Sequence, residues 1–83
     1  MPDQQQSRLE EAARLYDDAA HELDRAARHC IVAAQHFRDG EIPRGAAHAW
    51  AARGHLLNAE QRLDDQARTH SERSFLPDEA REP

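Results

Sequence analysis

The sequence predicts an all-α protein: an antiparallel hairpin of two long, heptad-patterned helices that homodimerises into a four-helix bundle. Three observations support this prediction: a pair of alanines that recurs every seven residues, one short break near the middle of the chain, and apolar side chains that a single hairpin would leave in water. The 83 residues form one small domain at most. A chain of this length buries little apolar surface, and a second copy would supply the missing burial.

The first helix is predicted over about residues 8–39. Alanine pairs start at positions 12, 19, 26 and 33, and a larger side chain precedes each pair by three residues. With the larger side chains at heptad position a and the alanines at d and e, this pattern is typical of a long helix whose seam is packed by another helix. Ser7 and Glu10 have the spacing of a capping box, which predicts that the helix starts there. The position a residues are Leu9, Tyr16, Leu23, Cys30 and Phe37.

A turn is predicted at Gly40 to Ile42. Gly40 suits the residue that follows a helix, where a left-handed backbone carries no Cβ penalty, and Pro43 suits the first turn of the next helix. The second helix is predicted over about residues 43–74 and repeats the heptad in weaker form. Because the connection is so short, the two helices must lie antiparallel. Alanine at d and e lets their axes approach closely.

The domain organisation follows from these elements. The helical hairpin is predicted to span residues 7–76 as a single unit. The N-terminal residues 1–6 and the acidic tail 77–83 are mostly polar or charged, and Pro77 breaks the helical pattern. We therefore expect both of these terminal segments to be disordered.

Charge and composition argue against several classes of partner. The sixteen acidic residues outnumber the eleven basic ones, for a net charge of −5, which argues against a nucleic-acid-binding surface. No stretch approaches the roughly 18 apolar residues of a membrane span. The first residues carry no targeting pattern, and the lone Cys30 is expected to be a small buried hydrophobe of the seam. We therefore expect a cytoplasmic protein that binds neither nucleic acid nor membrane.

A homodimer interface is predicted from four apolar residues that lie off the seam, at heptad positions b and c. In a hairpin they fall in the half nearer the turn, where a lone hairpin would leave them in water. A second hairpin would cover them. The alternative is that they are scattered surface hydrophobes on a monomer. The four residues are Ile31, Val32, Trp50 and Leu57.

Four of the six histidines occupy heptad position g, namely His29, His36, His48 and His55. With the turn centred on residues 41–42, residues whose numbers sum to about 84 lie level in the hairpin. The pattern therefore predicts that His29 faces His55 and that His36 faces His48.

Three interpretations of these histidines stay open. Neutral imidazole is a common ligand of Zn, Cu, Ni and Fe, so the four rings are candidate ligands of a transition metal or a metal-bearing cofactor. Ligands seven residues apart give only two imidazoles at each level, and only Asp39 offers a carboxylate within one turn. The second interpretation is structural, with the rings capping the narrow alanine seam. The third is a pH-sensitive clasp, because two facing imidazoles are costly to charge together.

The sequence contains no pattern typical of an enzyme. Gly40, Gly45 and Gly54 are isolated and form no phosphate-binding loop, and the neighbours His29 and Cys30 point about 100° apart on a helix. We expect a small cytosolic interaction or regulatory module that acts as a homodimer, without catalytic activity or cofactor, and that has a further protein partner the sequence does not identify. The alternative is the metal-binding bundle. A more distant one is an acidic, inhibitor-like partner of a basic protein.

Overall fold

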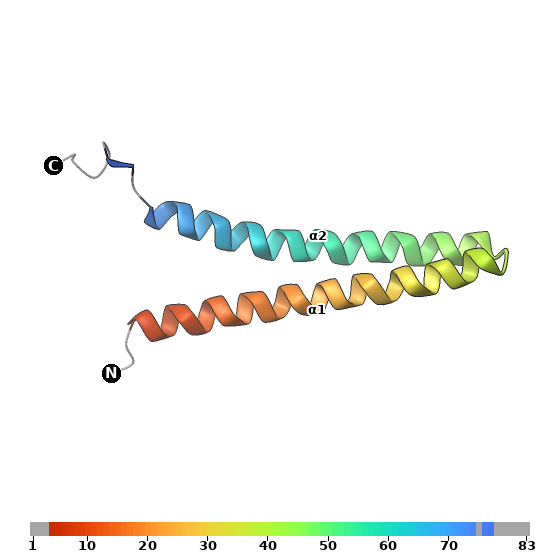
Figure 1. The fold of residues 1–83 in the computed structure, drawn as a ribbon, viewed down its shortest axis with the longest axis horizontal. Helices are drawn as coiled ribbons and strands as arrows, with labels where there is room; N and C mark the ends of the chain where they lie inside the picture. Colours follow the sequence, from red (N-terminus) through yellow and green to blue (C-terminus); the bar gives the residue numbers. More distant parts are fainter. Residues whose placement is uncertain (1–3, 75, 78–83) are drawn as a thin grey trace.

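The computed structural model describes residues 4–74 and 76–77, which form two long α-helices packed against each other (Figure 1). Helix α1 spans Gln4–Arg38 and helix α2 spans Ile42–Arg73, with no strand among the described residues. The all-α hairpin is confirmed. The first helix starts earlier than expected, because residues 4–6 are helical rather than disordered and Ser7 lies inside α1 instead of capping it. The disorder expected for residues 1–3 and 78–83 lies outside the described residues.

The turn between the helices is confirmed at Gly40, although Ile42 belongs to α2 rather than to the turn. Gly40 has a left-handed backbone with φ of 75°, a conformation that glycine adopts without steric cost. The Gly40 N–H donates to the Phe37 carbonyl at 3.0 Å, and the Glu41 N–H donates to the His36 carbonyl at 2.8 Å. These two bonds form a Schellman motif, which ends α1 and satisfies its last carbonyls. Pro43 then lies in the first turn of α2, where a missing N–H costs nothing.

The contact between the helices is a row of small residues at heptad position d. The buried apolar residues of the described chain are all alanines of this row, as expected from the doublets. Gly45 continues the row, and a Cβ there would lie 2.7 Å from the ring of Phe37. The buried members of this row are therefore only alanine and glycine. The alanines are Ala19, Ala33, Ala52 and Ala59.

The position a residues of α1 are not buried in this seam as predicted, although the ring of Phe37 lies against Gly45 of α2. Tyr16 is 52% exposed and Phe37 47% exposed, and Cys30 is exposed rather than a buried hydrophobe. The second row of the seam is position g, where His29 and His48 are half-buried. The alanine row lets the two backbones approach closely, and the large side chains of position a lie along one flank of the seam.

The hairpin is a single layer of helices. Its extents are 65 × 34 × 12 Å, and its depth of 12 Å is that of one helix. The radius of gyration is 19.3 Å, whereas a compact domain of this length would have about 12 Å. Domains usually bury the apolar side of one layer against another layer. The described hairpin has no second layer to do so.

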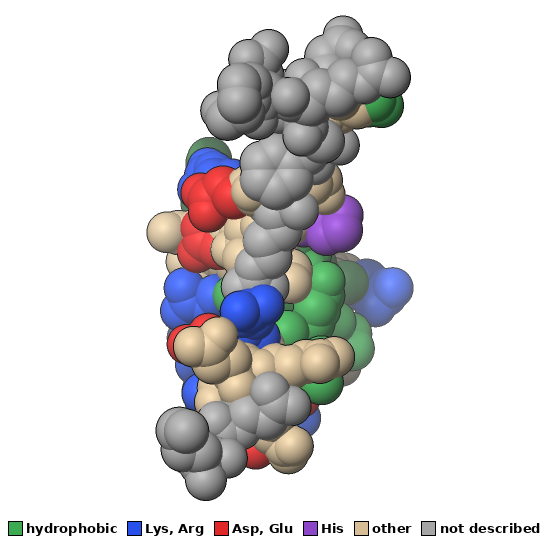
Figure 2. All heavy atoms as spheres, turned by 90° about the vertical axis from the view of Figure 1, so that its left-hand side faces the viewer, with side chains coloured by type: hydrophobic (Ala, Val, Ile, Leu, Met, Phe, Trp, Pro, Cys, Tyr) green, Lys and Arg blue, Asp and Glu red, His purple; other side chains and the backbone are tan. Residues whose placement is uncertain are grey.

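One face of this layer is apolar. In an antiparallel pair, equal heptad positions of the two helices lie on the same face, so the position a rows of α1 and α2 run side by side. Viewed from the end that carries both termini, the hydrophobic side chains gather on one side of the hairpin (Figure 2). We call this surface the apolar face. It consists of Leu9, Tyr16, Leu23, Cys30 and Phe37 from α1 and Leu56 and Leu63 from α2.

Candidate functional site: a histidine ladder and an apolar face

Six position g side chains form a continuous row along the other side of the alanines, which we call the histidine ladder. The four rings come alternately from the two helices, so each ring lies between two side chains from the other side of the hairpin. The ladder contains the four histidines predicted as candidate ligands. In order from the turn it consists of Glu41, His36, His48, His29, His55 and Glu22.

Imidazole–imidazole contacts build the middle of the ladder. His29 Nδ1 and His48 Nδ1 lie 2.9 Å apart, so one nitrogen donates a hydrogen bond and the other accepts it. His29 stacks on His55 with ring centroids 5.3 Å apart, and His36 stacks on His48 at 5.4 Å. Both predicted pairs are therefore brought together. The contact between His29 and His48, which level pairing does not predict, joins the two pairs into one row.

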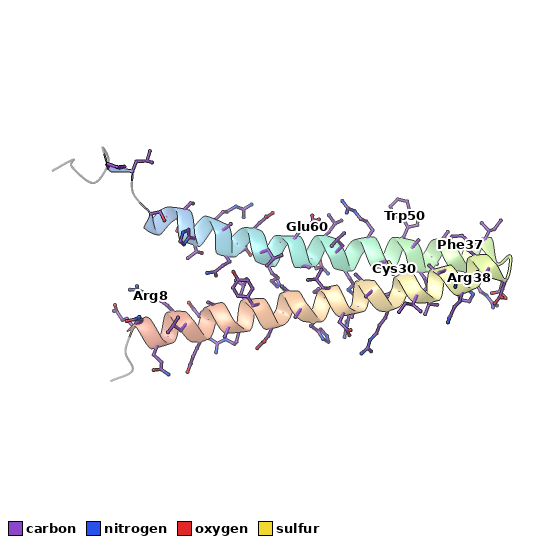
Figure 3. All side chains as sticks on the ribbon, viewed as in Figure 1. Arg8, Cys30, Phe37, Arg38, Trp50 and Glu60 are labelled. Carbon is purple, nitrogen blue, oxygen red and sulfur yellow. The ribbon has the colours of Figure 1, made fainter. Side chains whose placement is uncertain are left out.

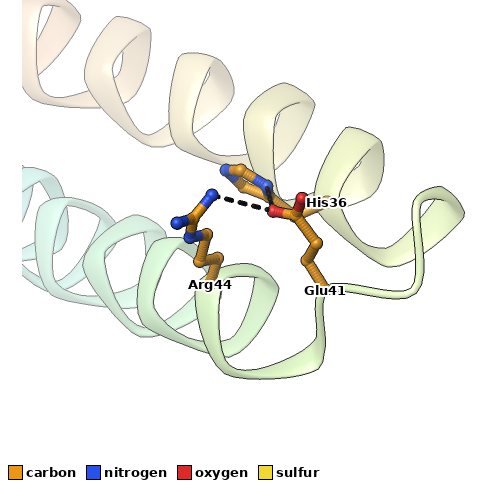
Figure 4. Close-up of polar contacts among 3 residues, drawn as sticks. All are labelled: His36, Glu41 and Arg44. Atoms are coloured by element: carbon orange, nitrogen blue, oxygen red, sulfur yellow. Dashed lines mark hydrogen bonds and ion pairs between the residues drawn. The ribbon is translucent and has the colours of Figure 1, made fainter.

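A carboxylate closes each end of the ladder. His55 Nδ1 donates to Glu22 Oε2 at 2.6 Å, and His36 Nδ1 donates to Glu41 Oε2 at 2.9 Å. Figure 4 shows the end near the turn, where the Arg44 guanidinium also donates to Glu41 at 3.3 Å. Glu41 is the last residue of the turn, so the Schellman motif and this end of the ladder are built by the same residues.

The contacts of Glu22 change its acidity. Its side chain is 19% exposed, and the Asn58 amide donates a second hydrogen bond to Oε2 at 3.4 Å. The hydrogen bond from His55 lowers the pKa of the Glu22 carboxyl below its ordinary value of 4.5. Burial acts in the opposite direction, while the Asn58 bond and the charges of His55 and Arg25 lower the pKa further.

Both carboxylates were missed from the sequence, and the expectation that only Asp39 lies near the histidines was wrong. The sequence does contain a spacing that could have identified them. Each half of the hairpin carries a Glu, a His and a second His at spacings of seven residues, and all of them fall at position g. The two sets are related by a pseudo-two-fold axis through the His29–His48 bond, which exchanges Glu22 with Glu41. The sets are Glu22, His29, His36 on α1 and Glu41, His48, His55 in the turn and α2.

The ladder leaves the Nε2 atom of each ring outside its hydrogen bonds. Every hydrogen bond of the four rings uses Nδ1. Among the described residues no buried side-chain nitrogen or oxygen lacks a partner, so the four Nε2 atoms reach solvent. The same part of the chain contains no group of three or more His, Cys, Asp or Glu side chains arranged around one ion position.

The predicted dimer residues lie outside the apolar face. Trp50 is 76% exposed and points away from α1 (Figure 3), and Ile31 and Leu57 share its heptad position b. Position b is opposite the seam, so Ile31 lies on the outer edge of α1 and the other two lie on the outer edge of α2. Val32 is half-buried. Their role as the dimer interface stays a prediction.

The described ends of the helices diverge away from the turn (Figure 1). A groove of about 610 Å³ lies between them. Charged side chains of both signs line it, together with the apolar side chains of Leu9 and Leu15. It contains none of the histidines. The charged residues are Arg8, Glu11, Arg14, Asp18, Arg62 and Asp65.

Comparisons of the chain with protein-family models, with curated proteins and with solved structures find no match. Across the described residues, neither α1 nor α2 has a segment both long and apolar enough to traverse a bilayer.

Proposed function

We propose that this protein is a cytosolic, non-catalytic interaction module in which two hairpins pack through their apolar faces into a homodimeric four-helix bundle. The supporting observation is the heptad itself. Positions d and g supply the buried alanines and the histidine ladder between the helices, yet positions a and e of α1 keep the same period of seven residues on a largely exposed surface. A period maintained on an exposed surface is typical of packing against further helices.

The shape of the apolar face favours a second copy as its occupant. On α1, the large row that contains Tyr16 and Leu23 runs beside a row of alanines at position e. A row of large side chains beside a row of alanines can pack against its own two-fold copy, because the large row of each hairpin lies over the alanine row of the other. An isologous interface requires this self-complementarity. The position e residues are Ala13, Ala20, Ala27 and Ala34.

The surface area is consistent with this proposal. The chain has an accessible surface of 6858 Å², whereas a compact protein of 9.5 kDa exposes about 5,000 Å². A standard interface buries about 800 Å² on each partner. The excess therefore leaves room for an interface of ordinary size. The outer edges that carry Ile31, Trp50 and Leu57 would stay exposed in the dimer and are where we expect a further protein partner.

Light scattering on two matched variants tests the proposal. The wild-type chain should have twice the monomer mass of 9.5 kDa. Leu23→Glu, which places a charge in the apolar face, should run as a folded monomer, whereas Trp50→Glu should remain a dimer. Dissociation by Trp50→Glu alone would move the interface to the outer residues predicted from the sequence. A wild-type chain that is helical and monomeric at micromolar concentration would refute the dimer.

A further inference from the structure

We propose that the histidine ladder binds one divalent transition-metal ion per hairpin, Zn²⁺, Ni²⁺ or Cu²⁺, between the two helices. The ligands are the Nε2 atoms of one stacked pair, either His29 with His55 or His36 with His48. This site is separate from the apolar face and does not depend on dimerisation. It requires only the hairpin.

The spacing of the rings suits a shared ion. Zn²⁺ binds imidazole nitrogen at about 2.0–2.1 Å, so two imidazoles on one tetrahedral ion have ring centres about 5 Å apart. The centroids of His29 and His55 are 5.3 Å apart, and those of His36 and His48 are 5.4 Å apart. The rings of each pair are stacked, so a shared ion requires them to rotate about their side-chain bonds until both Nε2 lone pairs point at it.

The carboxylates orient one ring of each pair. Glu22 accepts from His55 Nδ1 and Glu41 accepts from His36 Nδ1, so both of these rings present an unprotonated Nε2 when neutral. Metal-bound histidines in proteins usually donate their other N–H to a carboxylate or a carbonyl in this way. Imidazole ligands favour Zn²⁺, Ni²⁺ and Cu²⁺ over the harder Mg²⁺ and Ca²⁺.

The central hydrogen bond limits the ladder to one tightly bound ion. Between His29 and His48, the ring that donates from Nδ1 has a free Nε2, while the ring that accepts at Nδ1 carries its proton on Nε2. If His29 donates, it completes the pair with His55. If His48 donates, it completes the pair with His36. Filling both pairs would require both rings to carry Nδ1–H, which breaks the central bond.

Titration calorimetry with ZnCl₂ near pH 7.5 tests the proposal on the full chain. We expect saturable binding of one ion per hairpin, a much weaker second ion, and a metal-dependent rise in melting temperature. His55→Gln should still bind one ion, because the pair of His36 and His48 remains. The double variant His36→Gln/His55→Gln removes a ring from each pair and should lose at least about tenfold in affinity.

The matched control is the double variant His21→Gln/His70→Gln, which removes two exposed histidines outside the ladder. It should bind as the wild type does. Equal losses in the two double variants would overturn the site, as would the absence of saturable binding at about 100 µM Zn²⁺, well above the range expected for a specific site.

Ring NMR signals of the wild-type chain provide a readout that does not depend on a variant folding. Substoichiometric Cu²⁺ should broaden the ring signals of the four ladder histidines and leave those of His21 and His70 sharp. Broadening of all six to the same extent would refute a specific site. Glu22→Gln in a His36→Gln background is a second check. Only the pair of His29 and His55 then remains, and loss of the carboxylate should weaken binding by about 10- to 100-fold.

Discussion

The two rows that flank the alanines of this hairpin have the same period but differ in burial. The histidine ladder at position g is half-buried, with its side chains bonded or stacked in a row that ends at Glu22 and Glu41. The position a row is large, apolar and exposed, with Leu23 the least exposed of its large α1 hydrophobes at 43%. Medium-sized rings that hydrogen-bond across a narrow seam hold the helices in register, while the bulky side chains remain for another surface.

The largest effect is expected from blocking the apolar face without touching the ladder. Ala20→Trp places a large ring in the row of alanines at position e, where the side chain is exposed in the hairpin. It should weaken the dimer by at least about 100-fold, because overpacking an interface core costs several kcal/mol. Sedimentation over a concentration series would measure this. Gln35→Trp adds the same ring at an exposed position f and should leave the dimer intact. Equal dimerisation of both variants would contradict the proposed packing.

The next largest effect concerns the alanine row itself. Ala33 is 5% exposed, and Ala33→Leu would push the helices apart and pull the ladder rings out of contact. We expect a loss of about 1–3 kcal/mol in the free energy of unfolding, measured by urea denaturation. Ala47→Leu, at an exposed position of α2, serves as the control and should change little. A stable Ala33→Leu hairpin would show that the seam is less tightly packed than described.

A smaller effect separates two glycines of α2. Gly54 has open space where a Cβ would lie, so Gly54→Ala should stabilise the helix by about 0.5–1 kcal/mol. At Gly45 the added Cβ meets the ring of Phe37, so Gly45→Ala should give no stabilisation unless that ring leaves its place. Paired thermal denaturation curves measure the difference. Equal stabilisation by both substitutions would mean that Phe37 does not pack on Gly45.

The smallest expected effect is on stability in acid. Because the His55 hydrogen bond lowers the pKa of Glu22 in the folded chain, this carboxylate stabilises the fold at pH values above its ordinary pKa. The contribution is lost as the pH falls through the lowered pKa. Glu22→Gln should therefore reduce stability at neutral pH and flatten the acid side of the stability curve. Unfolding should be followed with a chelator present. Glu60→Gln, at an exposed site of α2 (Figure 3), should leave the curve unchanged.

Much of the ladder could be predicted from the sequence. The two stacked pairs follow from the position of the turn and from the period of the histidines, because both are local properties of the chain. Glu22 and Glu41 were within reach, since they share position g with the histidines. The hydrogen bond between His29 and His48 was not, because it depends on a stagger between the helices that the level pairing ignores.

The sequence by itself determined the two helices, the left-handed turn at Gly40 and the presence of small residues at position d, because each depends on local backbone preference or on side-chain size. The tertiary structure alone decided which flank of the alanine row closes the seam. Positions a and g lie on either side of d and repeat with the same period of seven, so periodicity cannot distinguish them. Packing does, because imidazoles capped by Glu22 and Glu41 bond across the alanine seam, while Tyr16 and Phe37 stay about half exposed beside it.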